Sequence, residues 1–217
     1  GAWCCTVYNH MYHPRAYAKP EEGGLMKEYE HLTQHVSMWN VSVERQIRVK
    51  GPDAADFVNL VITRDVHKKL PPMMARYVIL CNEAGGIIND PVLLRIAEDE
   101  FWFSISDSDL MLWLQGINVG GKYDVEIDEI DVAPVQIQGP KAKDMMVEIF
   151  GEDILNVRYY GLMEGKIKSI DGNKEMSVVI SRTGFSGEIG FEVYLRDATL
   201  HADEFWDRML KEGEPSN

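Results

Sequence analysis

An internal near-repeat limits what this chain can fold into more than any other feature of its sequence. One copy, residues 47–58, reads IRVKGPDAADFV, and the other, residues 135–146, reads VQIQGPKAKDMM. Each copy alternates apolar and polar residues as a half-buried strand does, breaks at Gly-Pro, and continues with helical spacing. Two copies of one strand–turn–helix start predict two related subdomains in a single chain.

Segments rich in strand-forming residues follow each copy. The expected strands cover residues 77–81, 87–96 and 101–106 after the first copy, and 176–181 and 191–195 after the second. Turns at Gly85-Gly86 and Glu98-Asp99 make the first group an antiparallel meander. The fold class is therefore predicted to be α+β, built from two related strand–helix–hairpin subdomains.

Apolar spacing and helix-end signals predict further helices. They are expected over about residues 26–39, 110–114, 143–150 and 199–209. In the first of them, Leu32, Val36 and Trp39 recur at i, i+4 and i+7, which places them on one helix face. Gly151 is an expected stop for the third.

Composition and charge exclude several classes of protein. The 217 residues are 45% hydrophobic, enough for a buried core, and no apolar run approaches the roughly 20 residues that cross a bilayer. The net charge of −13 repels nucleic acid and anionic membrane, so neither is expected as a partner. Three cysteines without a Cys-x-x-Cys motif, and a start without a secretion signal, predict a cytoplasmic protein with no disulfide framework and no zinc site.

Asn89-Asp90-Pro91 places a carboxylate inside an otherwise apolar strand. Pro91 removes a ladder donor and restricts the backbone of Asp90, so the strand is expected to be distorted there. A carboxylate held stiffly on a strand is suited to general acid–base work or to accepting an amine. The alternative is an aspartate that ends one strand pairing and binds turn N–H groups.

The loop of residues 182–190 carries three glycines and is followed by Glu192. Glycines permit close approach of a flat ligand to the backbone. A carboxylate at Glu192 is suited to a ring with adjacent N–H donors, such as a pterin. The alternative is a long hairpin turn with a surface glutamate.

Histidines and aromatic residues suggest two other kinds of site. His31 and His35 lie one helical turn apart but lack a third ligand, so no metal site is expected. Aromatic side chains form cages for sulfonium or ammonium groups, although core packing is the alternative for each. The candidates for such a cage include Tyr8, Trp39, Phe185 and Tyr194.

Six segments together resemble the glycine-cleavage T-protein family of folate-dependent transferases, in order and in spacing. They are residues 49–54, 63–66, 75–77, 82–90, 137–140 and 182–192. The resemblance implies three domains around a tetrahydrofolate site, with the first domain interrupted by the second. Residues 1–47 plus 133–217 would then form the first folate-binding subdomain and residues 48–132 the inserted second one, with the third, C-terminal domain absent from this chain.

The resemblance also implies roles for particular residues. Asp90 matches the acidic residue beside the reactive folate nitrogen, where it would orient folate and assist proton movement at N5. Glu192 matches the glutamate that holds the pterin ring, and Tyr77 matches a tyrosine of the folate site. Phe185 is a further cofactor-binding candidate. The residues expected to contact the methyl donor are Tyr8, Trp39 and Tyr194.

Two segments, residues 40–44 and 89–91, resemble the branch of the family that includes dimethylsulfoniopropionate demethylase, whereas Ser186-Gly187-Glu188 is more similar to the T-protein. The predicted function is tetrahydrofolate-dependent methyl transfer from a small donor such as a sulfonium, a methylamine or a methyl ether. One alternative is the aminomethyltransferase of glycine cleavage. The partner of that enzyme is a lipoyl carrier protein that is usually acidic, and a chain with a net charge of −13 would repel it. Another is a folate-binding accessory protein without catalysis. The donor and the oligomeric state stay open.

Overall fold

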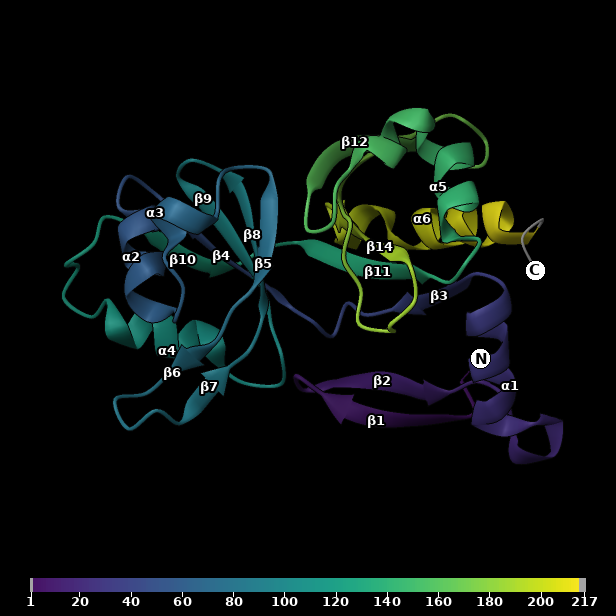
Figure 1. Ribbon diagram of the computed structural model, residues 1–217, viewed down its shortest axis with the longest axis horizontal. Helices are drawn as coiled ribbons and strands as arrows, with labels where there is room; N and C mark the ends of the chain where they lie inside the picture. Colours follow the sequence, from purple (N-terminus) through teal and green to yellow (C-terminus); the bar gives the residue numbers. More distant parts are fainter. Residues whose placement is uncertain (1, 215–217) are drawn as a thin grey trace. The chain divides into compact units, whose positions relative to one another are not determined.

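The computed structural model describes residues 2–214. The chain divides into two compact units: unit 1 consists of Gly1–Val43 and Val132–Asn217, and unit 2 of Glu44–Asp131. Each unit is built on a five-stranded antiparallel sheet with helices packed against it (Figure 1). The predicted α+β class is confirmed.

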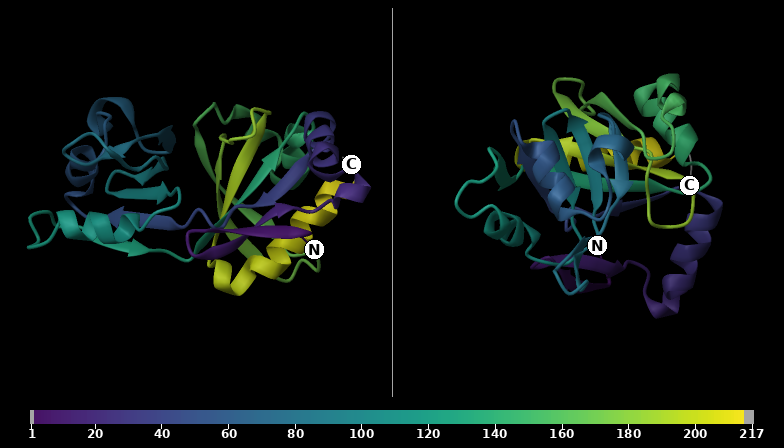
Figure 2. Two further views of the ribbon diagram at one scale, coloured as in Figure 1. Left: turned by 90° about the horizontal axis from the view of Figure 1, so that it is seen from below. Right: turned by 60° about the vertical axis from the view of Figure 1, so that its left-hand side comes forward.

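Unit 1 contains a large sheet and a separate hairpin. In spatial order the strands of the sheet are β12 (Leu162–Lys168), β13 (Glu175–Ser181), β14 (Gly190–Arg196), β11 (Val132–Gln138) and β3 (Ser37–Asn40). Its helices are α1 (Gly24–Gln34), α5 (Ala142–Phe150) and α6 (Ala198–Gly213), with 3-10 turns η1 (Pro20–Glu22) and η2 (Glu152–Asn156). The hairpin, β1 (Cys4–Tyr8) with β2 (Met11–Ala16), forms its own two-stranded ribbon (Figure 2).

Unit 2 repeats this plan. In spatial order the strands of its sheet are β10 (Glu126–Glu129), β4 (Gln46–Lys50), β9 (Glu100–Ser104), β8 (Val92–Ala97) and β5 (Met74–Tyr77). Its helices are α2 (Ala54–Val61), α3 (Val66–Lys69) and α4 (Leu110–Ile117). A short second hairpin joins β6 (Leu80–Cys81) to β7 (Ile87–Asn89).

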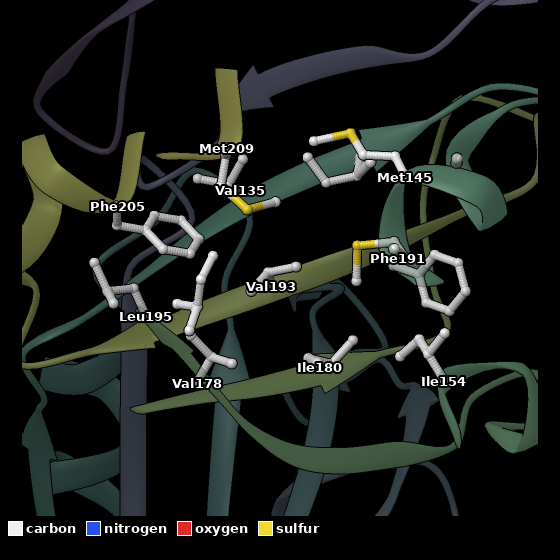
Figure 3. Close-up of a cluster of buried hydrophobic side chains, with 14 of the residues drawn as sticks. Val135, Met145, Ile154, Val178, Ile180, Phe191, Val193, Leu195, Phe205 and Met209 are labelled. Carbon is white, nitrogen blue, oxygen red and sulfur yellow. The ribbon is translucent and has the colours of Figure 1, made fainter. Parts of the chain in front are cut away.

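The core of unit 1 lies between its sheet and the helices α5 and α6. Val135, Val193 and Leu195 point from the sheet toward Phe205 and Met209 of α6 (Figure 3). All of these side chains are almost completely buried. Since alternate residues of a strand face opposite sides, residues 136, 192 and 194 lie on the other face of the sheet. The helices therefore leave one face of this sheet for polar side chains.

The Gly-Pro break of each repeat copy has the same geometry in both units. Gly51 ends β4 with φ +143°, and Gly139 ends β11 with φ +128°. In each copy the N–H of the residue three positions on donates to the glycine carbonyl at 3.0 Å, which begins α2 or α5. The repeat in the sequence thus predicts the strand-to-helix connection of both units.

The predicted helix over residues 26–39 is wrong at its C-terminal end. Helix α1 stops at Gln34, and residues 37–40 form strand β3 at the edge of the sheet. Lys141 N–H donates to the carbonyl of His35, which fixes the start of this strand beside β11. The i, i+4, i+7 spacing of Leu32, Val36 and Trp39 therefore spans a helix and a strand, because pairing with β11 outweighs the local pattern.

Candidate functional site

Asp90 lies in a break between two strands. Strand β7 ends at Asn89 and β8 begins at Val92, as the proline after Asp90 predicts. On the neighbouring strand β5, Tyr77 lies directly opposite Val92. The N–H of Val78, the residue after β5, donates to the carbonyl of Pro91 at 3.0 Å. This pairing brings the phenol of Tyr77 to the Asp90 carboxylate.

Both oxygens of the Asp90 carboxylate accept a hydrogen bond. Tyr77 OH donates to Oδ2 at 2.9 Å, and Ser106 Oγ donates to Oδ1 at 2.5 Å. Each carboxylate oxygen has further acceptor capacity, so Asp90 can still accept from a ligand N–H. Asp90 is only partly buried, so a ligand can reach it. The structure thus brings together two of the predicted site residues, Asp90 and Tyr77.

The Tyr77 phenol reports on this contact. Its hydrogen bond to Asp90, with smaller effects from desolvation and from the negative charge of Asp90, raises the pKa of Tyr77 above the ordinary 10.0. A pKa raised in the folded state stabilises the fold below pH 10. The contribution is lost as the pH rises through the folded-state value.

Glu192 lies on the polar face of the unit 1 sheet and is 4% exposed. Its Oε1 accepts from Gln136 Nε2 at 2.8 Å, and its Oε2 accepts from Thr183 Oγ1 at 2.6 Å and from Tyr194 OH at 2.8 Å. Ser181, directly opposite Glu192 on β13, lies 2.7 Å from the Thr183 hydroxyl. The carboxylate is a buried anion held by three donors, so it is not the surface glutamate of the alternative interpretation.

The glycine-rich loop before Glu192 is built around Gln138. The Nε2 of Gln138 donates to the carbonyls of Thr183 and Phe191 at 3.2 and 3.3 Å, and its Oε1 accepts from Ser186 Oγ at 2.8 Å. A Cβ on Gly184 would come within 2.1 Å of the Gln138 side chain. The space that the glycine leaves is therefore filled by Gln138.

Phe185 lies on this loop, and its side chain is 94% exposed. Arg182 Nε donates to the carbonyl of Gly190 at 3.1 Å, which ties the two ends of the loop together. A large apolar side chain on a fixed loop, without burial in its own unit, is available to a ligand ring. The structure gives it no contact with Glu192 or Tyr194 in the described residues.

Trp39 lies on the edge strand β3, opposite Gln136, in the same cross-strand row as Glu192 and one strand further from it. It also lines a groove of about 570 Å³ in unit 1. The apolar lining of the groove includes Met38, Trp39, Met145, Trp206, Met209 and Leu210. Trp39 and Tyr194 therefore lie on strands that are separated by β11.

His31 and His35 stack at 4.9 Å between ring centroids. His31 Nε2 lies 3.1 Å from the carbonyl of Val36, and Lys141 Nζ lies 3.2 Å from His35 Nδ1. These contacts close the C-terminal end of α1. In the part of the chain that the structure describes, no group of His, Cys, Asp and Glu side chains is arranged to hold a metal ion.

Tyr8 is the last residue of β1, and its ring lies 6.3 Å from that of His13 on β2. The turn after it is anchored by Asn9, whose Nδ2 donates to the carbonyl of Val43 at 2.8 Å.

The predicted site residues divide between the two units. Asp90 and Tyr77 belong to unit 2, and all the other predicted site residues belong to unit 1. Among residues 2–214, no helix is long and apolar enough to cross a membrane.

The polar residues around the two carboxylates were not predicted. They are Ser106, Gln136 and Thr183, while Gln138 binds the carbonyl of Thr183 rather than a carboxylate. Gln136 and Gln138 are the polar residues of the alternating strand pattern in the second repeat copy. Polar side chains on one face of a strand indicate contacts with the neighbouring strands. Ser106 and Thr183 follow the ends of β9 and β13, and nothing in their spacing predicts which carboxylate they contact.

Solved structures share the fold of this chain. The solved structure of glycine cleavage system aminomethyltransferase T from Bartonella henselae matches with a TM-score of 0.73 and 22% identity, over 95% of this chain and 53% of that one. A heterotetrameric sarcosine oxidase from Corynebacterium sp. U-96 matches with a TM-score of 0.55 and 16% identity, over 83% of this chain and 86% of that one. This likeness shows the fold of the aminomethyltransferase class.

The chain belongs to the GCVT N-terminal domain family, which matches residues 1–217. It is 34% identical to dimethylsulfoniopropionate demethylase DmdA of Ruegeria pomeroyi over 98% of this chain and 55% of that protein. It is 30% identical to an aminomethyltransferase of Thermotoga maritima and 29% identical to one of Alkaliphilus metalliredigens, over 86% and 88% of this chain and 50% of each relative. The chain spans about half the length of the curated relatives it matches.

Proposed function

We propose that this protein takes part in the transfer of a methyl group from a small methylated donor to tetrahydrofolate. The observation that carries the proposal is the Asp90 carboxylate, held by Tyr77 and Ser106 in a strand break and still open to a further donor. In the proposed reaction Asp90 orients the cofactor and assists proton movement at its reactive nitrogen. A placed acid or base contributes roughly 10²–10⁴ in rate.

The chemistry of Glu192 fits the ring of tetrahydrofolate. A pterin presents adjacent N–H donors, which a carboxylate accepts best because the bonds are charge-assisted. Glu192 Oε1 accepts a hydrogen bond from Gln136 and, as a carboxylate oxygen, keeps capacity for another. Phe185, fully exposed on its anchored loop, is proposed as an apolar contact of the cofactor. The bound cofactor would supply the nitrogen that receives the one-carbon unit.

The proposed donor class is a sulfonium, a methylamine or a methyl ether. The relative with 34% identity over 98% of this chain is named for demethylating dimethylsulfoniopropionate, a sulfonium compound. The aminomethyltransferases have lower identity over less of the chain. The comparison therefore supports the sulfonium as the first donor to test.

Aminomethyl transfer is the second candidate function. It is supported by the relatives named aminomethyltransferase and by the loop of residues 186–188, which is similar to the T-protein. The charge of −13 weakens docking of an acidic carrier protein. Release of ammonia from an aminomethylated carrier, faster than any demethylation, would favour this candidate.

Calorimetric titration of tetrahydrofolate into this chain tests the proposal. Saturable binding is expected, and Asp90→Asn should leave the affinity within about threefold while methyl transfer falls roughly 10²–10⁴-fold. Methyl transfer is measured as methylated tetrahydrofolate formed from dimethylsulfoniopropionate, a methylamine or an aryl methyl ether.

Asp99→Asn is the matched control, because Asp99 is an exposed aspartate in the turn between β8 and β9 of the same unit. It should change neither affinity nor turnover. Binding without turnover of any donor would instead support the folate-binding accessory protein. No saturable binding up to roughly millimolar ligand would contradict the proposal.

A further inference from the structure

The side chain of Asn89 forms a clamp on the segment that follows β9. Asn89 is 3% exposed. Its Oδ1 accepts from the N–H of Ser106 at 3.1 Å, and its Nδ2 donates to the carbonyl of Ser106 at 2.9 Å and to Ser108 Oγ at 2.7 Å. A single side chain therefore binds both backbone groups of Ser106.

Only an amide can satisfy these backbone groups together. The N–H of Ser106 requires an acceptor and its carbonyl requires a donor, which also fixes the orientation of the Asn89 amide. An ionised aspartate has no donor, so at position 89 it would face the carbonyl of Ser106 with a second negative oxygen. The contact is specific for asparagine or a residue that copies its amide.

Fixing the backbone of Ser106 also aims its hydroxyl. Ser106 Oγ lies 2.5 Å from Asp90 Oδ1, on the side of the carboxylate opposite the Tyr77 contact at 2.9 Å. Asn89 and Asp90 are neighbours in the chain. Asn89 binds the backbone of Ser106, and the hydroxyl of Ser106 binds Asp90. The carboxylate is thus fixed from β5 on one side and from the segment after β9 on the other.

We propose that Asn89 and Ser106 are positioning residues that hold the Asp90 carboxylate in its reactive orientation. The inference rests on the proposed function, because it concerns the residue assigned to the transfer step. A carboxylate already fixed before the cofactor binds loses no rotamer freedom in the reaction, and small displacements of such groups are costly in rate. Asn89 acts through Ser106, and Ser106 acts on Asp90.

The titration of Tyr77 tests this positioning without any cofactor or donor. The chain is labelled at the tyrosine ζ carbon, the Tyr77 signal is identified as the one missing in Tyr77→Phe, and its pKa is measured by NMR. Ser106→Ala and the uncharged Asn89→Leu should each remove part of the upward shift of the Tyr77 pKa, because Asp90 then leaves its place beside the phenol. Ser106→Thr keeps the hydroxyl and should keep the shift.

A Tyr77 pKa that stays unchanged or rises in Ser106→Ala would overturn the proposal, since Asp90 would then hold its place without Ser106. Ser106 is only partly buried, so this variant is expected to fold even where Asn89→Leu does not. In the methyl-transfer assay, Ser106→Ala should lower kcat roughly ten- to a hundredfold with KM within about threefold. A shifted Tyr77 pKa without methyl transfer by the unmodified chain would contradict the proposed function and leave the positioning intact.

Discussion

Gly139→Ala is expected to destabilise unit 1 by about 3 kcal/mol or more. Gly139 has φ +128°, a backbone conformation that residues with a side chain rarely adopt. A Cβ there would also lie 2.3 Å from the carbonyl oxygen of His35 and 2.9 Å from that of Leu32. Both atoms are backbone, at the junction of α1 and β3, so the clash is relieved only by moving the edge strand.

The repeat supplies an internal replicate of this prediction. Gly51 has φ +143°, and its Cβ would lie 2.4 Å from the carbonyl oxygen of Asp124, just before the edge strand β10. Gly51→Ala should therefore destabilise unit 2 by a similar amount. Amide hydrogen exchange resolves the two effects, with lost protection in β11 and β14 for the first variant and in β4 and β9 for the second.

Gly116→Ala is the control for both substitutions. Gly116 lies within helix α4, and a Cβ there meets nothing within 4 Å. Gly116 lies in the last turn of α4, so alanine there should leave stability unchanged or raise it by at most about 1 kcal/mol. A loss below about 1 kcal/mol in Gly139→Ala would show that the junction of α1 and β3 moves freely, contrary to the packing described.

The repeat in the sequence predicts the architecture well because its residues are required by the local backbone conformation where a strand turns into a helix. A glycine with positive φ, a proline at the start of a helix and an alternating strand before them are local requirements. The same holds for the strand break at Asp90, where Pro91 removes a ladder donor. The end of α1 is different, since residues 37–40 form a strand only because β11 lies beside them.

The candidate site is predicted less completely, for a reason that also lies in tertiary structure. The resemblance names Tyr77 and Asp90, but their separation of 13 residues does not predict the contact at 2.9 Å. Gln136 contacts Glu192, which lies 56 residues later in the sequence. Ser106 contacts Asp90, although strands β8 and β9 lie between them in the sequence. Such donors are defined by strand register, which a single sequence does not determine.

The alternatives left open at the sequence level differ in how the structure bears on them. The sequence alone also allows Glu192 to be a surface residue of a hairpin, and its burial and its three donors contradict that interpretation. Trp39 and Tyr194 lie on β3 and β14, two strands that are separated in the sheet by β11. The roles of Glu192, Phe185 and Asp90 toward tetrahydrofolate stay predictions, and substitutions at Glu192 and Asp90 separate binding from transfer.

Glu192→Ala is expected to destabilise unit 1 by about 3 kcal/mol and to abolish tetrahydrofolate binding. The truncation leaves Gln136 Nε2, Thr183 Oγ1 and Tyr194 OH without their shared acceptor in a buried place. Thr183 can turn to Ser181, 2.7 Å away, so the cost falls mainly on the other two donors. Urea denaturation measures the loss of stability.

Because Glu192→Ala combines a structural and a binding defect, Glu192→Gln is the variant that separates them. The amide oxygen can accept from Gln136, and the amide nitrogen can donate to the hydroxyls of Thr183 and Tyr194, so the network persists at a loss of about 1 kcal/mol. The charge that would grip adjacent N–H donors is gone, and tetrahydrofolate affinity should fall roughly tenfold or more.

Glu164→Ala is the matched control, since Glu164 is an exposed glutamate of the same sheet that pairs with Arg196 at 3.1 Å. An exposed ion pair contributes about 0–1 kcal/mol, so neither stability nor affinity should change much. If Glu192→Gln binds tetrahydrofolate as tightly as the unmodified chain, Glu192 is a structural anion that organises Gln136, Thr183 and Tyr194. The assignment of the pterin contact to Glu192 then fails, while the Asp90 network, which lies in unit 2, is tested separately.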